Sequence, residues 1–296
     1  MKQLVVNKEF ENKKLSIYLH HQFDGLSINT IYKALRKKDI IVNGTRINTN
    51  VILHENDNIT IYIPDELLYK KIDIDIIYED SNIVVVNKPI GIEVITGNPD
   101  EKSMTTFLKE YYKDISIEKD FPSPCHRIDR NTCGLVLFAK NDKSSNILLD
   151  KFKNQEIEKH YSCVVYGIPK KEQYILSAYL FKDTKKSLVY ISDTPKKGYS
   201  KIVTSYTVLS KNKSNNTSVL DVQLHTGKTH QIRAHLAHIG LPIIGDGKYG
   251  INEINKQFNQ KTQLLQSYML KFNFKTDSGI LEYLNGKSIK LQKNIF

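Results

Sequence analysis

The chain of 296 residues is long enough for one large or two smaller domains, and its 43 basic against 32 acidic residues leave a formal charge of +11. This excess favours a polyanionic partner such as RNA or DNA, or an anionic membrane surface. The three cysteines lack C-x-x-C spacing, which predicts reduced thiols. No apolar segment is long enough to span a membrane, and the apolar core after Met1 is too short for a secretory signal. We therefore expect a cytoplasmic protein without a membrane partner.

Residues 1–63 are expected to form a small separate module. Ser27 can cap a helix over residues 28–37, in which the apolar residues share one face. Asn43-Gly44 is a strong signal for a hairpin turn, and residues 59–63 alternate between apolar and polar side chains as in a half-buried strand. The basic cluster Arg36, Lys37 and Lys38 is, from the residues alone, most simply a solvated helix end.

Residues 64–71 carry Pro and charge with little periodicity, which indicates a connector. A second domain is therefore predicted over residues 72–296. It opens with two apolar strands that end at Lys88-Pro89, and a helix begins at Ser103.

The segment H-R-I-D-R-N-T-C-G over residues 126–134 leads into an unbroken apolar run that is typical of a buried strand. It is therefore expected to be a loop pinned at the edge of a sheet. Asp129 lies between Arg127 and Arg130, an environment that favours the ionised carboxylate and suits a nucleophile or a base. The alternative is a surface loop whose Asp merely pairs with Arg.

Later elements carry further candidates. Residues 144–155 predict an amphipathic helix, and the strand that follows places Tyr161, Cys163 and Val165 on one face, where Tyr161 can be an ordinary core aromatic. Residues 184–200 predict either a mobile basic loop or a solvated hairpin.

A histidine-rich segment, residues 225–240, contains a helix that Thr229 can cap. Its Gly227-Lys228-Thr229 is not a phosphate-binding P-loop, because the glycine required five positions earlier is Val222. His235 and His238 are close enough to share a metal, but no third ligand of obvious spacing follows them.

Several of these motifs together resemble the RluA-type RNA pseudouridine synthases. The resemblance rests on residues 126–140, on K-H-Y-S-C-V-V-Y-G over residues 159–167 and on T-G-K-T-H-Q-I-R with the following residues to Gly250. It implies an α+β fold in which helices flank a mixed, mainly antiparallel sheet, and the conversion of uridine to pseudouridine in RNA. It also implies that Asp129 is catalytic, that Arg233 pairs with it and that Tyr161 lies against the target base.

Residues 26–47 resemble the S4-like RNA-binding module that often precedes this catalytic domain. The two resemblances together imply an RNA partner, with ribosomal RNA expected and tRNA as the alternative, and no cofactor. A monomer is the default expectation. The residues expected to bind substrate or RNA are Arg127, His126, Arg130, Lys228, His230, Gln231, Leu270, Arg36, Lys37 and Lys38.

Two rival functions follow from the same residues. An RNA-binding or assembly factor that has lost the chemistry would account for the charge and the N-terminal module. A metal-dependent hydrolase would require the histidines of residues 225–238 as ligands. The sequence does not identify the RNA or the uridine, and it leaves open whether Asp129 attacks the anomeric carbon or removes a ribose proton to give a glycal.

Overall fold

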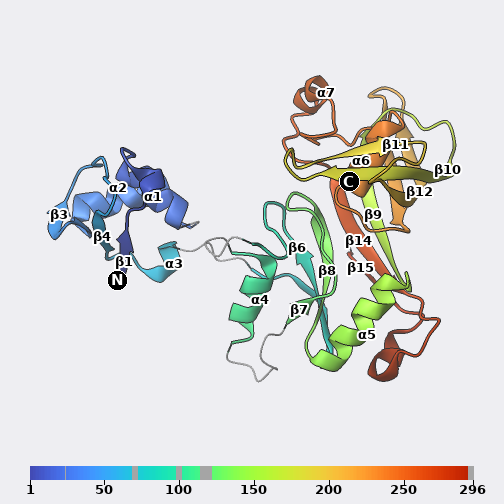
Figure 1. Ribbon diagram of the computed structural model, residues 1–296, viewed down its shortest axis with the longest axis horizontal. Coiled ribbons are helices and arrows are strands. Elements are labelled where there is room, and N and C mark those ends of the chain that lie inside the picture. Colours follow the sequence, from blue (N-terminus) through green and yellow to red (C-terminus); the bar gives the residue numbers. More distant parts are fainter. Residues whose placement is uncertain (24, 69–72, 98–101, 114–121, 293–296) are drawn as a thin grey trace. The chain divides into compact units, whose positions relative to one another are not determined.

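The computed structural model describes residues 1–23, 25–68, 73–97, 102–113 and 122–292. The chain divides into two compact units, Met1–Asp73 and Ile74–Phe296 (Figure 1). The N-terminal unit has a hydrophobic core of its own, and the second unit has a core on each face of its sheet. Residues 69–72, which include the end of the predicted connector, lie outside the described residues.

The N-terminal unit contains a small antiparallel sheet of order β1-β4-β2-β3, whose buried side chains share one core with the helices. Its elements are β1 (Lys2–Val5), η1 (Lys8–Phe10), α1 (Leu15–Gln22), α2 (Ile28–Lys37), β2 (Ile40–Val42), β3 (Thr45–Ile47), β4 (Asn58–Ile61) and α3 (Asp65–Leu68). Leu68 is completely buried in this core, so the packing of the unit continues beyond residue 63.

Local signals in this unit have the predicted outcomes. The hydroxyl of Ser27 accepts a hydrogen bond from the Thr30 amide and caps α2. Asn43 and Gly44 have positive φ angles of 49° and 80°, as the turn between β2 and β3 requires.

The second unit is built on one long mixed sheet of order β11-β10-β12-β13-β9-β14-β8-β6-β5, with β15 beside β14 and β7 beside β8. Among the described residues the pairing of β14 with β8 is parallel, and all the other pairings are antiparallel. The strands are β5 (Ile76–Glu79), β6 (Ile83–Lys88), β7 (Ser123–Pro124), β8 (Cys133–Ala139), β9 (Ile157–Tyr166), β10 (Gln173–Asp183), β11 (Leu188–Ser192), β12 (Ser200–Asn212), β13 (Thr217–Leu224), β14 (Leu265–Phe272) and β15 (Ser288–Lys290).

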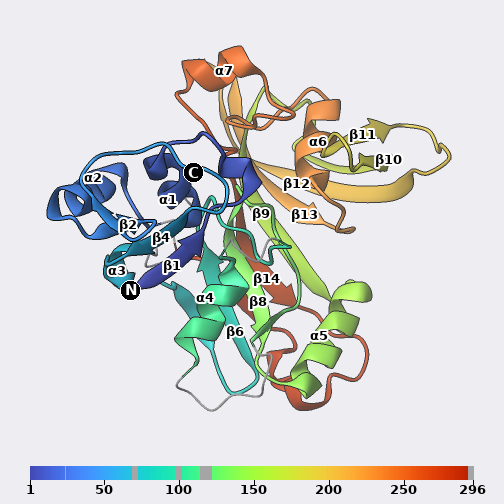
Figure 2. The same ribbon diagram turned by 60° about the vertical axis from the view of Figure 1, so that its left-hand side comes forward.

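Helices cover both faces of this sheet, as Figure 2 shows for α4 and α5. The helical segments are α4 (Met104–Tyr111), α5 (Asp142–Lys153), α6 (Gln231–His238), α7 (Asn252–Gln257) and η2 (Gly279–Leu284). Side chains of α4 and α6 share a core with Val136 and Phe138, whereas Leu148 of α5 packs with Leu135 and Leu137. Because neighbouring residues of β8 point to opposite faces, α5 lies on the other side of the sheet from α4 and α6. The predicted fold class, a mainly antiparallel sheet flanked by helices, is confirmed.

One local prediction is corrected, and one choice between two alternatives is decided. Helix α6 begins at Gln231 and is preceded by His230 in the left-handed conformation (φ 52°), so Thr229 is not its cap. Residues 184–200 contain the strand β11, which pairs with β10, so of the two alternatives for this segment the hairpin is the observed one.

Gly134 lies where the parallel and antiparallel parts of the sheet meet. Its φ angle is +112°, and a Cβ added there would lie 2.1 Å from the carbonyl oxygen of Ser267 on β14. We expect Gly134→Ala to lower the free energy of unfolding by more than about 3 kcal/mol, because the backbones of β8 and β14 would have to separate. Urea unfolding measures this, with Gly247→Ala as the control, because an added Cβ there meets no atom within 4 Å. Equal stabilities of the two variants would contradict the prediction.

Candidate active site

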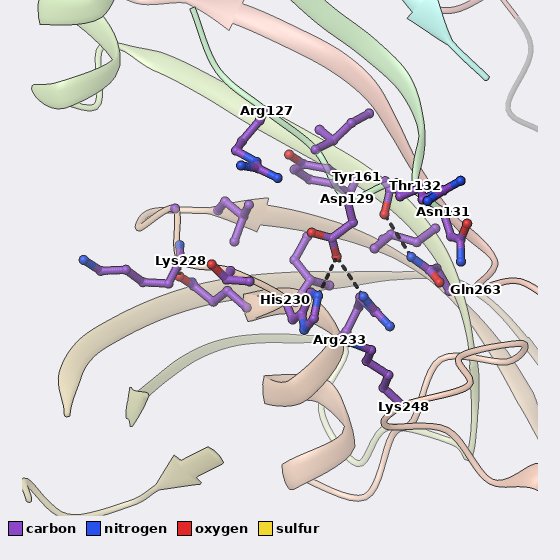
Figure 3. Close-up of a pocket in the computed structure, with 18 of the residues that line it drawn as sticks. Arg127, Asp129, Asn131, Thr132, Tyr161, Lys228, His230, Arg233, Lys248 and Gln263 are labelled. Carbon is purple, nitrogen blue, oxygen red and sulfur yellow. Dashed lines mark hydrogen bonds and ion pairs between the residues drawn. The ribbon is translucent and has the colours of Figure 1, made fainter. Parts of the chain in front are cut away.

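A cavity of about 710 Å³ brings together segments that lie far apart in the sequence (Figure 3). It is lined by residues 126–132 before β8, by Lys159 and Tyr161 of β9, by residues 227–233 at the start of α6, and by residues from the segments 245–248 and 261–265. A volume of this size is typical of pockets that bind small molecules or nucleosides.

The loop that carries Asp129 is anchored on both sides. The Thr132 amide donates a hydrogen bond to the Asp129 carbonyl, and the carbonyl of Arg130 accepts from the Gly91 amide. The same carbonyl accepts from the ammonium of Lys88 at 3.1 Å, and Lys88 also donates to the carbonyls of Pro89 and Ile92. Burial of this lysine lowers its pKa to about 8. The loop around Asp129 is therefore held by its own turn and by contacts with Lys88 and Gly91.

Arg233 brings a guanidinium from α6 to this loop. Its Nη1 donates to Asp129 Oδ2 at 2.9 Å, the contact drawn as a dashed line in Figure 3. The arginine side chain is 7% exposed and the Asp129 side chain 27%, so the carboxylate faces the cavity while its partner is enclosed.

A second carboxylate, Asp246, holds the other side of Arg233. Its two oxygens accept from Nε at 2.7 Å and from Nη2 at 2.9 Å, the bidentate geometry that suits a guanidinium. Burial by itself would raise the pKa of Asp246, but the hydrogen bonds from Arg233 and from the amides of Lys248 and Tyr249 hold this pKa below its usual value. Arg233 is thus fixed by Asp246 and presents Nη1 to Asp129.

Tyr161 lies on β9 with 4% of its surface exposed and lines the cavity beside Asp129 (Figure 3). Burial, and then the charge of Asp129, raises the pKa of its phenol. The ring therefore presents a protonated hydroxyl at neutral pH.

His230 and Gln231 both line the cavity, but their side chains have different hydrogen-bond partners. The Nδ1 of His230 shares a hydrogen bond with the Tyr249 hydroxyl, and its Nε2 lies 4.0 Å from Asp129 Oδ2. Burial lowers its pKa, so the ring is neutral near pH 7. Gln231 lines the cavity, but its amide donates to Val203 and Thr204 while its carbonyl accepts from Thr226 and Lys228. These bonds engage both ends of the Gln231 side-chain amide within the protein, and its RNA contact stays a prediction.

Leu270 and His126 also depart from the expected arrangement. Leu270 is completely buried with Phe272 in the core on the α5 face of the sheet, whereas Leu265, on the same strand, lines the cavity. His126 lines the cavity, but its Nε2 accepts from the Leu137 amide at 3.1 Å and its ring packs on Phe152. Burial lowers its pKa to about 3, so it is not a cation.

The other expected RNA ligands are exposed. Arg127, Arg130 and Lys228 lie at the rim of the cavity, where Arg130 Nε donates to the Gly91 carbonyl at 3.0 Å. Arg36, Lys37 and Lys38 are exposed at the end of α2 in the N-terminal unit.

Sequence reasoning assigned no role to four residues that the structure brings to this site. These are Lys88, Lys159, Asp246 and Gln263, of which Lys159 and Gln263 line the cavity. Asp246 lies within the motif that carried the resemblance, so a carboxylate thirteen positions after Arg233 was visible in the sequence. The sequence does not show that Arg233 is the residue that pairs with it.

The histidines of residues 225–238 do not converge on one point. His225 bonds Ser205, His235 bonds Thr204 and His238 bonds Asp193, while His230 bonds Tyr249. In the part of the chain that the structure describes, no group of three or more His, Cys, Asp or Glu residues could hold a metal ion. Across the same residues, no helix combines the length and apolar character needed to cross a bilayer.

Comparison with known proteins agrees with this geometry. The profile of the RNA pseudouridylate synthase family matches residues 82–238. The chain is 33% identical to an RNA pseudouridine synthase of Mycoplasma capricolum, over 98% of this chain and 97% of that protein. It is also 33% identical to a ribosomal large subunit pseudouridine synthase C of Rickettsia bellii, over 96% of this chain and 91% of the relative.

The fold is also found in solved structures. Human RNA pseudouridylate synthase domain containing 1 superimposes with a TM-score of 0.56 at 20% identity, covering 69% of this chain and 80% of that chain. Domain containing 4 gives 0.54 at 22% identity, covering 66% and 83%. The family profile covers the loop of residues 126–132, strand β9 and helix α6, and the relatives match along nearly their whole length, so the chain belongs to the RNA pseudouridylate synthase family and is an RNA pseudouridine synthase.

Proposed function

We propose that Asp129 is the catalytic carboxylate, that it acts on a uridine flipped out of structured RNA, and that the substrate is ribosomal RNA of the large subunit. One observation carries the assignment of Asp129. Its Oδ2 is held by Arg233, while no atom of the described residues is hydrogen-bonded to its Oδ1, and the side chain borders a cavity large enough for a nucleoside.

The reaction requires a carboxylate in this position. The bond between the ribose anomeric carbon and N1 of uracil breaks, the base turns, and a bond forms between the same carbon and C5. The proton on C5 is lost and N1 gains one, so atoms balance without a redox step. Asp129 can attack the anomeric carbon or remove a proton from the neighbouring ribose carbon, and Oδ1 is available for either.

The base must leave its stack before it can turn, so the nucleotide is everted into the cavity. Tyr161 supports the uracil ring. Arg127, exposed at the rim, fills the space that the nucleotide leaves. The Arg233–Asp246 pair keeps the carboxylate in place throughout, because rigid placement of reacting groups supplies much of a catalytic rate.

Large-subunit ribosomal RNA is the substrate that the Rickettsia relative's name supports. The S4-like assignment of the N-terminal unit adds a second RNA contact through Arg36, Lys37 and Lys38, whose cations suit phosphates. We expect the protein to act as a monomer in the cytoplasm.

The test uses ribosomal RNA from cells that lack this protein. Incubation with the purified chain is expected to create new pseudouridines, detected as stops of reverse transcriptase after carbodiimide treatment. A protein that binds this RNA and creates no new site would be a binding factor, and the proposal would be wrong.

Tyr161→Phe separates the two roles of that side chain. The phenyl ring keeps the packing and the contact with uracil, whereas loss of the hydroxyl removes a group that can handle the proton on C5. We expect turnover to fall by about 10²- to 10⁴-fold, with the dissociation constant for RNA nearly unchanged. Single-turnover kinetics and filter binding measure the two quantities. Full activity in the variant would limit Tyr161 to packing.

A further inference from the structure

A second cavity, of about 240 Å³, adjoins the active-site cavity. The two share Lys159, Leu224, Gly227 and Lys228 in their linings, so Lys159 stands at their junction. The second cavity also includes Lys153 and a single carboxylate, Glu158.

That carboxylate is already engaged by other side chains. Glu158 accepts a hydrogen bond from Asn273 at 3.3 Å and lies 3.6 Å from His160 and 3.8 Å from Lys271. The junction is therefore a place of uncompensated positive charge.

Lys159 has no acceptor of its own in the described protein. Its Nζ lies 5.4 Å from the centre of the Phe152 ring, and no carboxylate, carbonyl or hydroxyl of the described residues is hydrogen-bonded to it. Burial lowers its pKa. An ammonium enclosed in this way is costly unless an anion approaches it.

His126 adds a second unused donor beside the same ring. Because its Nε2 accepts from the Leu137 amide, the proton of the neutral imidazole is on Nδ1. Nδ1 is buried and has no hydrogen-bond partner among the described residues. The ring centres of His126 and Phe152 are 4.8 Å apart, so this donor and Lys159 flank one aromatic side chain.

We propose that the junction of the two cavities binds a phosphate group of the RNA next to the flipped uridine, with Lys159 as its cationic ligand. The inference rests on the proposed function of the neighbouring cavity. Lys159 and Tyr161 are two residues apart on β9 and therefore lie on the same face, about 7 Å apart along the strand. Asp129, Tyr161 and Lys159 line the same cavity, so in the proposed binding mode, with the uracil on Tyr161 and the ribose at Asp129, the attached phosphodiester is the group that meets Lys159.

The test compares Lys159→Met, which keeps the apolar stem, with Lys159→Arg, which keeps the charge. Lys170→Met is the matched control, because Lys170 is exposed in the turn after β9 and lines neither cavity. The probes are a transcript of large-subunit ribosomal RNA and an oligouridylate. Binding is measured from low to high salt, and kcat and KM are measured on the transcript.

For Lys159→Met we expect the dissociation constant to rise about tenfold, and the slope of log affinity against log salt to shrink by roughly 0.7 to 1, as for one lost phosphate contact. KM should rise while kcat changes little, and Lys159→Arg should keep the wild-type salt slope. An unchanged slope in Lys159→Met, or equal losses in the Met and Arg variants, would overturn the phosphate site and leave Lys159 a packing role.

A second variant serves if Lys159→Met does not fold. A Cβ on Gly227 would lie 3.5 Å from Lys159 Nζ, so Gly227→Val covers the ammonium and keeps its charge. We expect this variant to weaken binding to both RNAs, and unchanged affinity would overturn the proposal. Oligouridylate binding reports on the site even if the wild-type protein makes no pseudouridine in the transcript, so the two proposals can fail separately.

Discussion

Asp129→Asn is expected to abolish pseudouridine formation, with a loss of at least about 10³-fold, while RNA binding and folding stay nearly intact. The amide oxygen can still accept from Arg233 Nη1, but a neutral amide is neither a nucleophile nor a base. Arg233 keeps Asp246 as its main ionic partner, so the free energy of unfolding should change by less than about 1 kcal/mol. Carbodiimide mapping, filter binding and urea unfolding measure the three properties.

Asp277→Asn is the matched control for this variant. Asp277 is exposed, and its Oδ1 accepts from the Gly279 amide, a bond that Asn can also accept. Both variants thus lose one charge and keep an acceptor. Retained activity in Asp129→Asn would remove Asp129 from the chemistry, and loss of activity in the control would point to a general effect of charge.

Arg233→Met should have the largest combined effect on stability and activity. It leaves the carboxylate of Asp246, whose side chain is 0% exposed, without its cation. Breaking one side of a buried ion pair typically costs about 3–5 kcal/mol of the free energy of unfolding. Activity should fall by at least about 10²-fold, because Asp129 loses the group that orients it.

The double variant Arg233→Met/Asp246→Asn separates these effects. An asparagine at 246 can still accept from the amides of Lys248 and Tyr249, and no unpaired charge remains in the core. We expect most of the lost stability to return, while activity stays low. Recovery of both would show that Arg233 acts through stability alone, and recovery of neither would contradict the assignment of the penalty to a buried unpaired charge.

Patterns of residues predicted much of the fold. The apolar run after Gly134 is the buried strand β8, and Ser27 caps α2, because both signals act within a few residues. The N-cap of α6 was predicted at Thr229, one residue before its observed position at His230. There, the Gln231 side chain bonds the Val203 carbonyl and the Thr204 hydroxyl of β12 and the Thr226 hydroxyl in the loop after β13. The partners from β12 are not visible in a local pattern.

Some of the residues predicted for the candidate site line its cavity, and others do not. Asp129, Tyr161 and Arg233 were predicted through motifs, and the structure brings the three to one cavity. Leu270 or a near neighbour was predicted to support the base. Strand β14 turns Leu265 toward the cavity and Leu270 to the opposite core. The two residues are five positions apart, and side chains separated by an odd number of positions in a strand point to opposite faces.

By itself, the sequence predicted the mainly antiparallel architecture and the family of the chain through the resemblance of contiguous motifs, and it predicted the loop that carries Asp129 from a polar segment before an apolar run. Only the tertiary structure decided that Asp246 holds Arg233, that Lys88 anchors the carbonyl of Arg130 and that Lys159 stands between two cavities. Each of these arrangements depends on which side chains from distant strands and loops pack together. The free energy of a buried charge is set by the groups around it in space, and not by its neighbours along the chain.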